Sequence, residues 1–492
     1  MAWEFLPLVP ILALGAGAVG AFLAGRALRV RGGTAASLIA LASLGVAFAA
    51  FLALYDPEGR TAAYAPFGEA VLRADGLAVL LGLVATGLAI AVTLYSLVRM
   101  WGEPFRAEFT ALFLLMVMGV SGLGLAGDLF NLYVFFELMA IATYALVAYP
   151  RTKAEASEAG MKYLVMNAAG SLVALLGIGI VYLTSPARTL DLRVLASPAN
   201  AMPPEAALLA AGLMIAGFGV KAAVVPMHTW LPDAYTSAPT GVTAMLGGIV
   251  TQAGLLAMVR GLSVLRVDPD VGMSYGLLMA FLAVLTMTVG NLTAMHQTDL
   301  KRMLAYSSVA QVGYVLLGFG VGLELGVAIA VTGALFHIVN HALMKGGAFL
   351  AAGALERTFG TRDLAALRGV ARRAPALGFA FGVFVLGLAG VPPTAGFLSK
   401  LLIATGAAQG GALGVFFVVA LIGNSILSLA YYVPALTGLF SKEGAPPEGG
   451  RIPRGIAALL AVFAGLVLLF GLWPDLVLQF VNPAVRGILG GP

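Results

Sequence analysis

The sequence contains no cysteine, and only 10% of its 492 residues are charged. Without cysteine, the chain cannot form disulfides, use a catalytic thiol or bind an iron–sulfur cluster through thiolates. It also lacks a phosphate-binding loop and a glycine fingerprint for dinucleotides. Soluble domains carry about 25% charged residues. We therefore expect no soluble fold, and no hydrolysis, redox chemistry or cofactor in this chain itself.

Long apolar runs dominate what remains, because 60% of the residues are hydrophobic. Runs of about 20 such residues cross a bilayer as helices, whereas barrel strands alternate over about 10 residues. The sequence thus predicts an all-α polytopic membrane protein with about fourteen transmembrane helices. The expected spans are 5–25, 34–54, 76–98, 109–127, 128–149, 161–184, 207–232, 241–263, 274–294, 304–322, 326–354, 375–404, 412–440 and 455–473.

The loops predict an orientation, since cytoplasmic loops are enriched in Lys and Arg. With fourteen spans and both termini outside, 18 of the 28 Lys and Arg residues fall on the inner side and 7 on the outer side. We therefore expect both termini outside. The outer residues are Arg60, Arg73, Arg188, Arg193, Arg260, Arg266 and Arg486.

Four charged residues lie deep inside the expected spans, away from the span ends: Glu137, Lys221, Lys345 and Lys400. A charge at this depth is costly and usually marks an ion or proton path. Lys221 also precedes a helix break at Pro226. Such a break persists in a bilayer only where protein or a water-filled cavity satisfies the freed backbone groups. These features predict ion transport.

A second break, at Pro392 and Pro393, precedes Lys400 and lies about 166 residues after the first. Paired interrupted helices are typical of transporter repeats. Because each unit holds five helices, the second enters from the opposite side, which predicts an inverted repeat. The expected divisions are an N-terminal three-helix segment 1–108, a first unit 109–263, an inverted second unit 274–440, and a C-terminal helix and tail 441–492.

Glu137 and Lys221 form the first candidate site. In a low-dielectric interior an isolated acid tends to bind a proton and an isolated lysine tends to lose one. Within hydrogen-bonding reach each stabilises the other's charge, so their separation sets the protonation state. This arrangement predicts a proton switch. The alternative interpretation is a structural ion pair between helices.

His337, His341 and Lys345 follow one another at four-residue intervals on one helical face, next to Asn340. Histidine titrates near neutrality, so the stripe suits a proton relay. A zinc site is the rival interpretation, but no third acidic or thiol ligand is nearby in sequence and we expect no metal. A packed, inert histidine pair is the other alternative.

Lys400 follows the second break and is the last charged group before the outer side, so it is expected to exchange protons there. The alternative is a lysine that snorkels from a helix end. Polar residues between the candidate groups are expected to bridge them, although each alone is typical of a helix–helix hydrogen bond. They are Gln252, Ser307, Ser308, Gln311, Asn424 and Asn167, with His228 as a further supporting residue.

These segments resemble the antiporter-like subunit superfamily of Mrp sodium/proton antiporters, respiratory complex I and membrane-bound hydrogenases. Its D-subunit family in Mrp antiporters is most similar in length and in the spacing from Glu137 to Lys221. The segments are FFELMAIATY, VKAAVVPMHTWLPDAYTSAPTGVTAML, QTDLKRMLAYSSVAQVGY, FHIVNHALMKGGAFL and GVPPTAGFLSK.

The resemblance implies that Glu137 is the acid of the fifth helix and Lys221 its partner in the broken seventh helix. His337, His341 and Lys345 would form the central relay and Lys400 the exit group. One position departs, because Gln252 stands where the family usually has a lysine. A neutral amide holds water but carries no proton as a charge.

The resemblance also implies work inside a multisubunit complex in a prokaryotic plasma membrane, with other membrane subunits as partners and no nucleic acid. Two functions follow. The chain is either a sodium/proton antiporter subunit or a proton-pumping subunit of a redox enzyme such as complex I or a hydrogenase. The residue chemistry is nearly the same for both. A scaffold with relict charges is a weaker third alternative.

Overall fold

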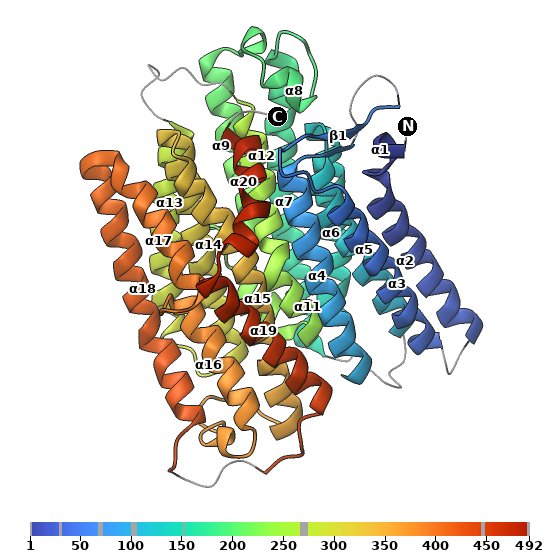
Figure 1. Ribbon diagram of the computed structural model, residues 1–492, viewed down its shortest axis with the longest axis vertical. Helices are drawn as coiled ribbons and strands as arrows, with labels where there is room; N and C mark the ends of the chain where they lie inside the picture. The colour runs from blue at the N-terminus through green and yellow to red at the C-terminus, as the bar shows by residue number, and fades with distance from the viewer. Residues whose placement is uncertain are drawn as a thin grey trace.

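The computed structural model describes residues 2–28, 32–66, 72–99, 106–150, 153–265, 274–443 and 448–489. Long helices run roughly side by side along the molecule and form one bundle (Figure 1). Within these residues, thirteen helical stretches are long and apolar enough to cross a membrane. The strands described form only one two-stranded sheet. The predicted all-α polytopic membrane fold is confirmed.

The N-terminal segment packs three long helices and a hairpin, and the C-terminal part adds two helices. The hairpin and the final helix were not predicted as separate elements. These elements are α1 (Ala2–Phe5), α2 (Leu8–Leu28), α3 (Gly32–Ala53), β1 (Ala62–Tyr64), β2 (Leu72–Ala74), α4 (Gly76–Arg99), α19 (Arg454–Leu472) and α20 (Asp475–Leu489).

The first predicted unit contains five membrane-crossing segments and short connecting elements. Its eighth predicted span is interrupted by a π-helical turn at a Gly–Gly pair, a feature that is frequent at functional sites. The elements are α5 (Arg106–Leu125), α6 (Leu129–Val147), α7 (Ala154–Thr184), α8 (Leu192–Leu195), η2 (Pro198–Asn200), α9 (Pro204–Ala222), α10 (Trp230–Ser237), α11 (Thr240–Met245), η3 (Leu246–Val250) and α12 (Thr251–Ser263).

The second predicted unit also contains a broken helix, because the predicted span 375–404 is two helices. The elements are α13 (Tyr275–Ala294), α14 (Leu300–Leu325), α15 (Ala328–Phe359), η5 (Val370–Arg372), α16 (Pro375–Ala389), α17 (Ala395–Ala407), η6 (Ala408–Gly410) and α18 (Gly411–Leu439). Helix α15 packs against α14, α16 and α17.

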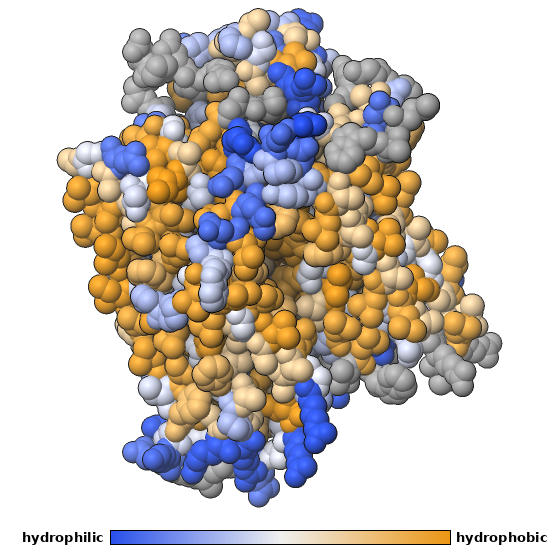
Figure 2. Space-filling view, viewed as in Figure 1, coloured by the Kyte–Doolittle hydropathy of each residue, from blue (hydrophilic) through white to orange (hydrophobic). Residues whose placement is uncertain are grey.

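The surface is apolar around the middle of the molecule and hydrophilic toward its two ends (Figure 2). A hydrophilic patch also extends down the face where Figure 1 places α20. Leu176 and Leu183 are among the large apolar side chains that stay exposed, at 60% and 71%. Such a belt fits a chain surrounded by lipid or by other membrane subunits.

At both breaks the freed backbone groups find protein partners. Helix α9 ends before Ala223, which has a left-handed backbone (φ 57°), and the following Val225–Pro226 peptide is cis. The Trp230 indole donates to the Val220 carbonyl at 2.7 Å, and Thr286 accepts from the Val225 amide at 3.1 Å. The first break therefore meets the requirement for irregular backbone within a membrane.

The second break has the same plan. Helix α16 ends before Gly390, whose φ of 87° suits glycine, and the Pro392–Pro393 peptide is cis. Here the side chain that satisfies the freed carbonyls is charged, since Lys400 Nζ donates to Leu388 O at 2.9 Å and Ala389 O at 3.1 Å.

The two predicted units share one feature at a helix start. Asp128 caps α6 and forms an isolated bridge with Asp191, and Asp299 caps α14 and forms one with Asp363. These starts lie at opposite ends of the bundle. Helix α7 begins at the end of the bundle where α6 finishes. Asp233 pairs with Lys162, in the first turns of α7, and with Arg302, in the first turn of α14. The start of α14 therefore lies at the end of the bundle opposite to the start of α6.

Two arginines assigned to the outer loops are instead buried. Arg73 is 1% exposed and Arg260 is 5% exposed, and Arg260 Nη2 pairs with Asp75 at 2.7 Å. A count of charges along the chain does not register this tertiary burial, and the expected side of the membrane stays a prediction for both residues. Arg266 lies outside the described residues.

Candidate functional site

Lys221 is fully buried near the end of α9 and is held by two hydroxyl groups. Its Nζ donates to Tyr163 Oη at 2.6 Å and to Thr143 Oγ1 at 3.1 Å. It also lies 5.2 Å from the centroid of the Tyr144 ring and 4.6 Å from that of Tyr163. Aromatic faces and hydroxyls stabilise an ammonium without carrying a compensating charge.

Glu137 lies on α6, the helix that carries Thr143, and is half-buried. Both Glu137 and Lys221 are described, and no ion pair within 4.0 Å joins them. The Glu137 Oε1 atom has no hydrogen-bond partner among the described residues. Thr143 is about 9 Å further along α6. Lys221 therefore bonds to the hydroxyls of Thr143 and Tyr163, which lie nearer the break, and not directly to Glu137 as expected.

Lys345 anchors the second group of buried residues. Its Nζ donates to the Leu304 carbonyl at 2.8 Å and makes a short contact with Ser307 Oγ. Both partners lie on α14, which packs against α15. Lys345 is fully buried.

A continuous series of contacts joins the relay histidine to Lys400. His337 pairs through Nε2 with Gln311 Oε1 at 3.0 Å, and through Nδ1 with Ser399 Oγ at 2.8 Å. Gln311 Nε2 donates to Leu388 O at 3.0 Å, the same carbonyl that accepts from Lys400. The predicted residues His337, Gln311 and Lys400 therefore meet at the second break.

Between these groups lie buried side chains with polar atoms that have no hydrogen-bond partner in the described part of the chain. Neither polar atom of Gln252 and neither ring nitrogen of His341 has a hydrogen bond among the residues described, and Asn340 Oδ1 also lacks one. Gln252 lies on α12, which packs against α9 and follows the π-helical turn η3 that packs against α15. A Cβ added to Gly254 of the same helix would lie 3.0 Å from Lys221 Cγ. Buried polar atoms without protein partners usually bind ordered water.

The other predicted bridging residues mostly bond within their own helices. Ser308 donates to Leu304 O, Asn167 to Tyr163 O and Asn340 to Phe336 O. Asn424 reaches α13 instead, through Thr288 at 3.2 Å. His228 is half-buried in the break, and no described side chain bonds its Nδ1.

Tyr163 and Thr143 contact Lys221, and Ser399 contacts His337, but none of the three was predicted. Tyr163 lies near the start of a span, where tyrosine is common at membrane interfaces, so nothing in the sequence distinguishes it. Thr143 and Ser399 look like ordinary hydroxyls in helices. A search for hydroxyl residues on helices that flank a buried lysine would include them.

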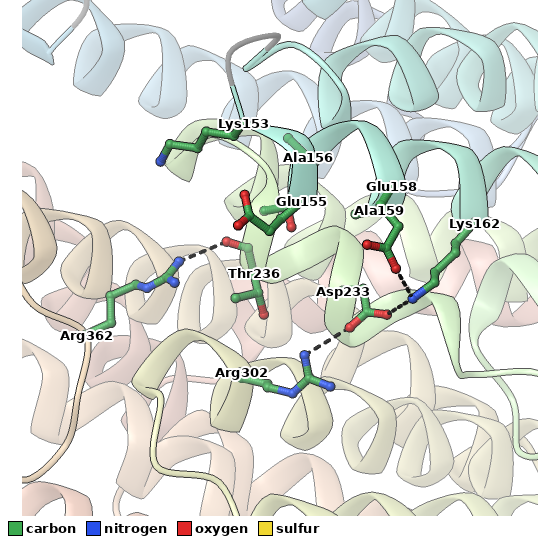
Figure 3. A pocket seen from close by; sticks show the side chains of 11 residues that line it. Lys153, Glu155, Ala156, Glu158, Ala159, Lys162, Asp233, Thr236, Arg302 and Arg362 are labelled. Carbon is green, nitrogen blue, oxygen red and sulfur yellow. Dashed lines mark hydrogen bonds and ion pairs between the residues drawn. The ribbon is translucent and has the colours of Figure 1, made fainter.

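A charged pocket of about 570 Å³ lies beside the first broken helix (Figure 3). Asp233, near the start of α10, pairs with Lys162 of α7 at 3.2 Å and with Arg302 of α14 at 2.9 Å. Arg362 donates to the Thr236 carbonyl at 3.0 Å. The second half of the broken helix is therefore tied to both units at this end of the bundle.

The chain is similar to several membrane subunits. It is 34% identical over 470 residues to F(420)H(2) dehydrogenase subunit N of Methanosarcina mazei, covering 91% of this chain and 92% of the relative. It is 36% identical over 435 residues to NADH-quinone oxidoreductase subunit N of Myxococcus xanthus, covering 82% of each. It is 32% identical over 431 residues to the D-type subunit of the Na(+)/H(+) antiporter of Bacillus subtilis, covering 86% and 84%.

Solved structures agree with the fold. A chain of the membrane-bound sulfane sulfur reductase, an archaeal respiratory membrane complex, matches with a TM-score of 0.86 at 30% identity, covering 99% of this chain and 98% of that one. A chain of the Mrp complex from Dietzia sp. matches with a TM-score of 0.87 at 26% identity, with the same coverage. These relatives come from multisubunit membrane complexes. Residues 126–428, which hold both groups of buried charges, match the transmembrane family model, and this chain therefore belongs to the NADH:quinone oxidoreductase/Mrp antiporter family.

Proposed function

We propose that this chain moves protons along a buried polar axis that runs from Lys221 past Gln252 to the α15 stripe and then to Lys400. The observation that carries the proposal is the burial of three lysines and two histidines without a carboxylate in direct contact among the described residues. Charge held by neutral hydroxyls and carbonyls is poorly compensated, so each group gives up or accepts a proton when its surroundings change.

Glu137 acts as the switch in this proposal. While it is ionised it favours a protonated Lys221 through the electric field, with Thr143 and Tyr163 holding the ammonium. Protonation or displacement of the acid removes that field, and the lysine proton is released toward Gln252. Water beside Gln252 and His341 completes the transfer, since neither side chain has a protein partner among the described residues.

Two assemblies are candidates for the driving force. In the predicted sodium/proton antiporter, a D-type subunit moves protons against sodium. In a redox-driven complex, an N-type subunit pumps protons on electron transfer. Sequence identity supports both candidates about equally, since it is 34–36% to N-type relatives and 32–34% to D-type relatives. The structural matches to respiratory and Mrp chains have nearly equal scores.

The expected placement is a prokaryotic plasma membrane with both termini outside. The charge distribution of the loops supports this orientation. Figure 1 places the N and C termini at the same end of the bundle, as an even number of crossings requires.

The test uses the whole complex in sealed vesicles, with internal pH as the readout. Glu137→Ala and Lys221→Ala are expected to abolish proton movement while the complex still assembles, and Tyr163→Phe is expected to slow it about 10- to 150-fold through loss of a bond to a charged group. The control is Arg451→Ala at an exposed site, with unchanged transport. Normal transport in Glu137→Ala or Lys221→Ala overturns the proposal.

Sodium separates the two assemblies in the same vesicles. An antiporter exchanges protons on a sodium jump without an electron donor. A redox-driven pump acidifies or alkalinises the vesicle only when donor and acceptor are supplied. Lys221→Ala is expected to remove whichever response the native complex gives.

A further inference from the structure

A second pocket, of about 650 Å³, lies where α13 and α18 end and α14 begins. Its lining includes Met295 just after α13, Met303 of α14 and Tyr431 of α18, together with the charged Arg368 and Lys442. It shares none of its lining with the pocket beside the first broken helix. Its charged rim belongs to loops that the sequence assigns to the inner side.

Each of the three helices carries a polar side chain one turn beyond the pocket, toward the middle of the bundle. Asn291 precedes Met295 by four residues, Ser307 follows Met303 by four, and Ser428 precedes Tyr431 by three. Residues three or four apart share a helical face. The pocket is therefore continued inward by a polar stripe on all three walls.

Hydrogen bonds tie this stripe together across helices. Tyr431 Oη donates to Asn291 Oδ1 at 2.9 Å, and Asn291 Nδ2 donates to Asn424 Oδ1 at 3.1 Å. Asn424 in turn donates to Thr288 Oγ1 at 3.2 Å. Tyr431 also lines the pocket, so the network begins at the pocket wall.

Hydroxyls at the inner end of the stripe have no protein partner among the described residues. They belong to Tyr432 and Tyr314, and both side chains are fully buried. Buried hydroxyls in that position usually bind water. Ser307 contacts Lys345, and the Tyr314 ring lies 4.0 Å from Lys400 Nζ. The stripe thus reaches both lysines of the second unit.

We propose that this pocket and the stripe beyond it form a water-filled access path from the membrane face that carries Lys442 to Lys345 and Lys400. The inference rests on the proposed function, because it gives the central relay its own contact with the inner water. The relay can then take up protons without waiting for transfer from Lys221 across Gln252. A separate supply of protons matters here because Gln252 is a neutral amide and cannot carry a proton as a charge.

Because the chain contains no cysteine, single cysteines can test the path directly. Charged methanethiosulfonate reagents attack the thiolate, which forms in water and not in lipid. Ser425→Cys and Ser428→Cys change one atom each and lie along the stripe. Ile426→Cys is the control, because its side chain on the same helix is 63% exposed on the apolar surface. Labelling is read as a mass shift of this chain within the assembled complex.

The path predicts labelling at Ser425→Cys and Ser428→Cys at least about tenfold faster than at Ile426→Cys. The faster labelling is expected when reagent reaches the face that carries Lys442, and not from the opposite face. Equal, slow labelling at all three sites overturns the path, as does labelling from the opposite face only.

Transport in the same complexes separates this inference from the proposed function. Labelled stripe cysteines together with normal transport in Lys221→Ala reject the proposed function while the water path stands. Unlabelled cysteines together with lost transport in Lys221→Ala reject the path alone.

Discussion

At the scale of single residues, the buried charges share one kind of environment. Lys221 is bound by hydroxyls, Lys345 by a hydroxyl and a carbonyl, and Lys400 by two carbonyls. None of these partners carries a full charge. An ammonium in such a site is stabilised by dipoles alone, which makes its proton easier to lose than that of a lysine in an ion pair.

Replacing Gln252 tests how protons pass between Lys221 and the histidines and lysine of α15. Gln252→Lys is expected to keep or raise the transport rate, since it restores a group that can carry the proton as a charge. The readout is proton flux per assembled complex in vesicles. Complete loss of flux would show that Gln252 does not stand in for a relay group.

At the scale of elements, the broken helix depends on close contact between α7 and α9. A Cβ added to Gly217 of α9 would lie 2.4 Å from the Ala174 amide nitrogen and 2.6 Å from the Gly170 carbonyl oxygen of α7. These are backbone atoms of a packed helix, so neither moves easily. The contact fixes α9 against the helix that supplies Tyr163 to Lys221.

Gly217→Ala is therefore expected to destabilise the fold by about 1–3 kcal/mol through overpacking. The matched control is Gly212→Ala on the same helix, where an added Cβ meets no atom within 4 Å. The control is expected to be neutral or slightly stabilising, because alanine favours helix. Thermal unfolding of the purified complex measures both, and equal midpoints would contradict the packing argument.

At the scale of the whole molecule, buried ion pairs join segments that are far apart in the chain. Asp75, just before α4, pairs with Arg260 near the end of α12, and the exposed fractions of the two side chains are 10% and 6%. Asp75 Oδ1 also accepts from the Ala78 amide at 2.8 Å and so caps α4. This pair ties the N-terminal segment to the first unit, away from the proposed proton axis.

Asp75→Ala is expected to cost about 3–5 kcal/mol, because it leaves the Arg260 guanidinium buried without its partner. Glu58→Ala is the control, since the Glu58–Arg60 pair is exposed and such pairs contribute about 0–1 kcal/mol. Unfolding of the complex followed by calorimetry measures the difference. A similar small loss in both variants would show that the buried pair adds no stability.

The sequence by itself determined the membrane fold, the broken helices and the identity of Glu137, Lys221, Lys345 and Lys400. It did so because a charge or a proline inside an apolar run is visible wherever the chain folds. A hydropathy profile therefore shows the position of each buried charge and each helix break without knowledge of the fold.

Only the tertiary structure decided what those charges touch. It placed Tyr163 and Thr143 on Lys221 in place of a direct bond to Glu137, and it buried the side chains of Arg73 and Arg260. Hydrogen-bond partners come from helices far apart in sequence, and their choice depends on how each helix is rotated and how deeply it sits. A one-dimensional pattern of apolar and polar residues does not record either quantity.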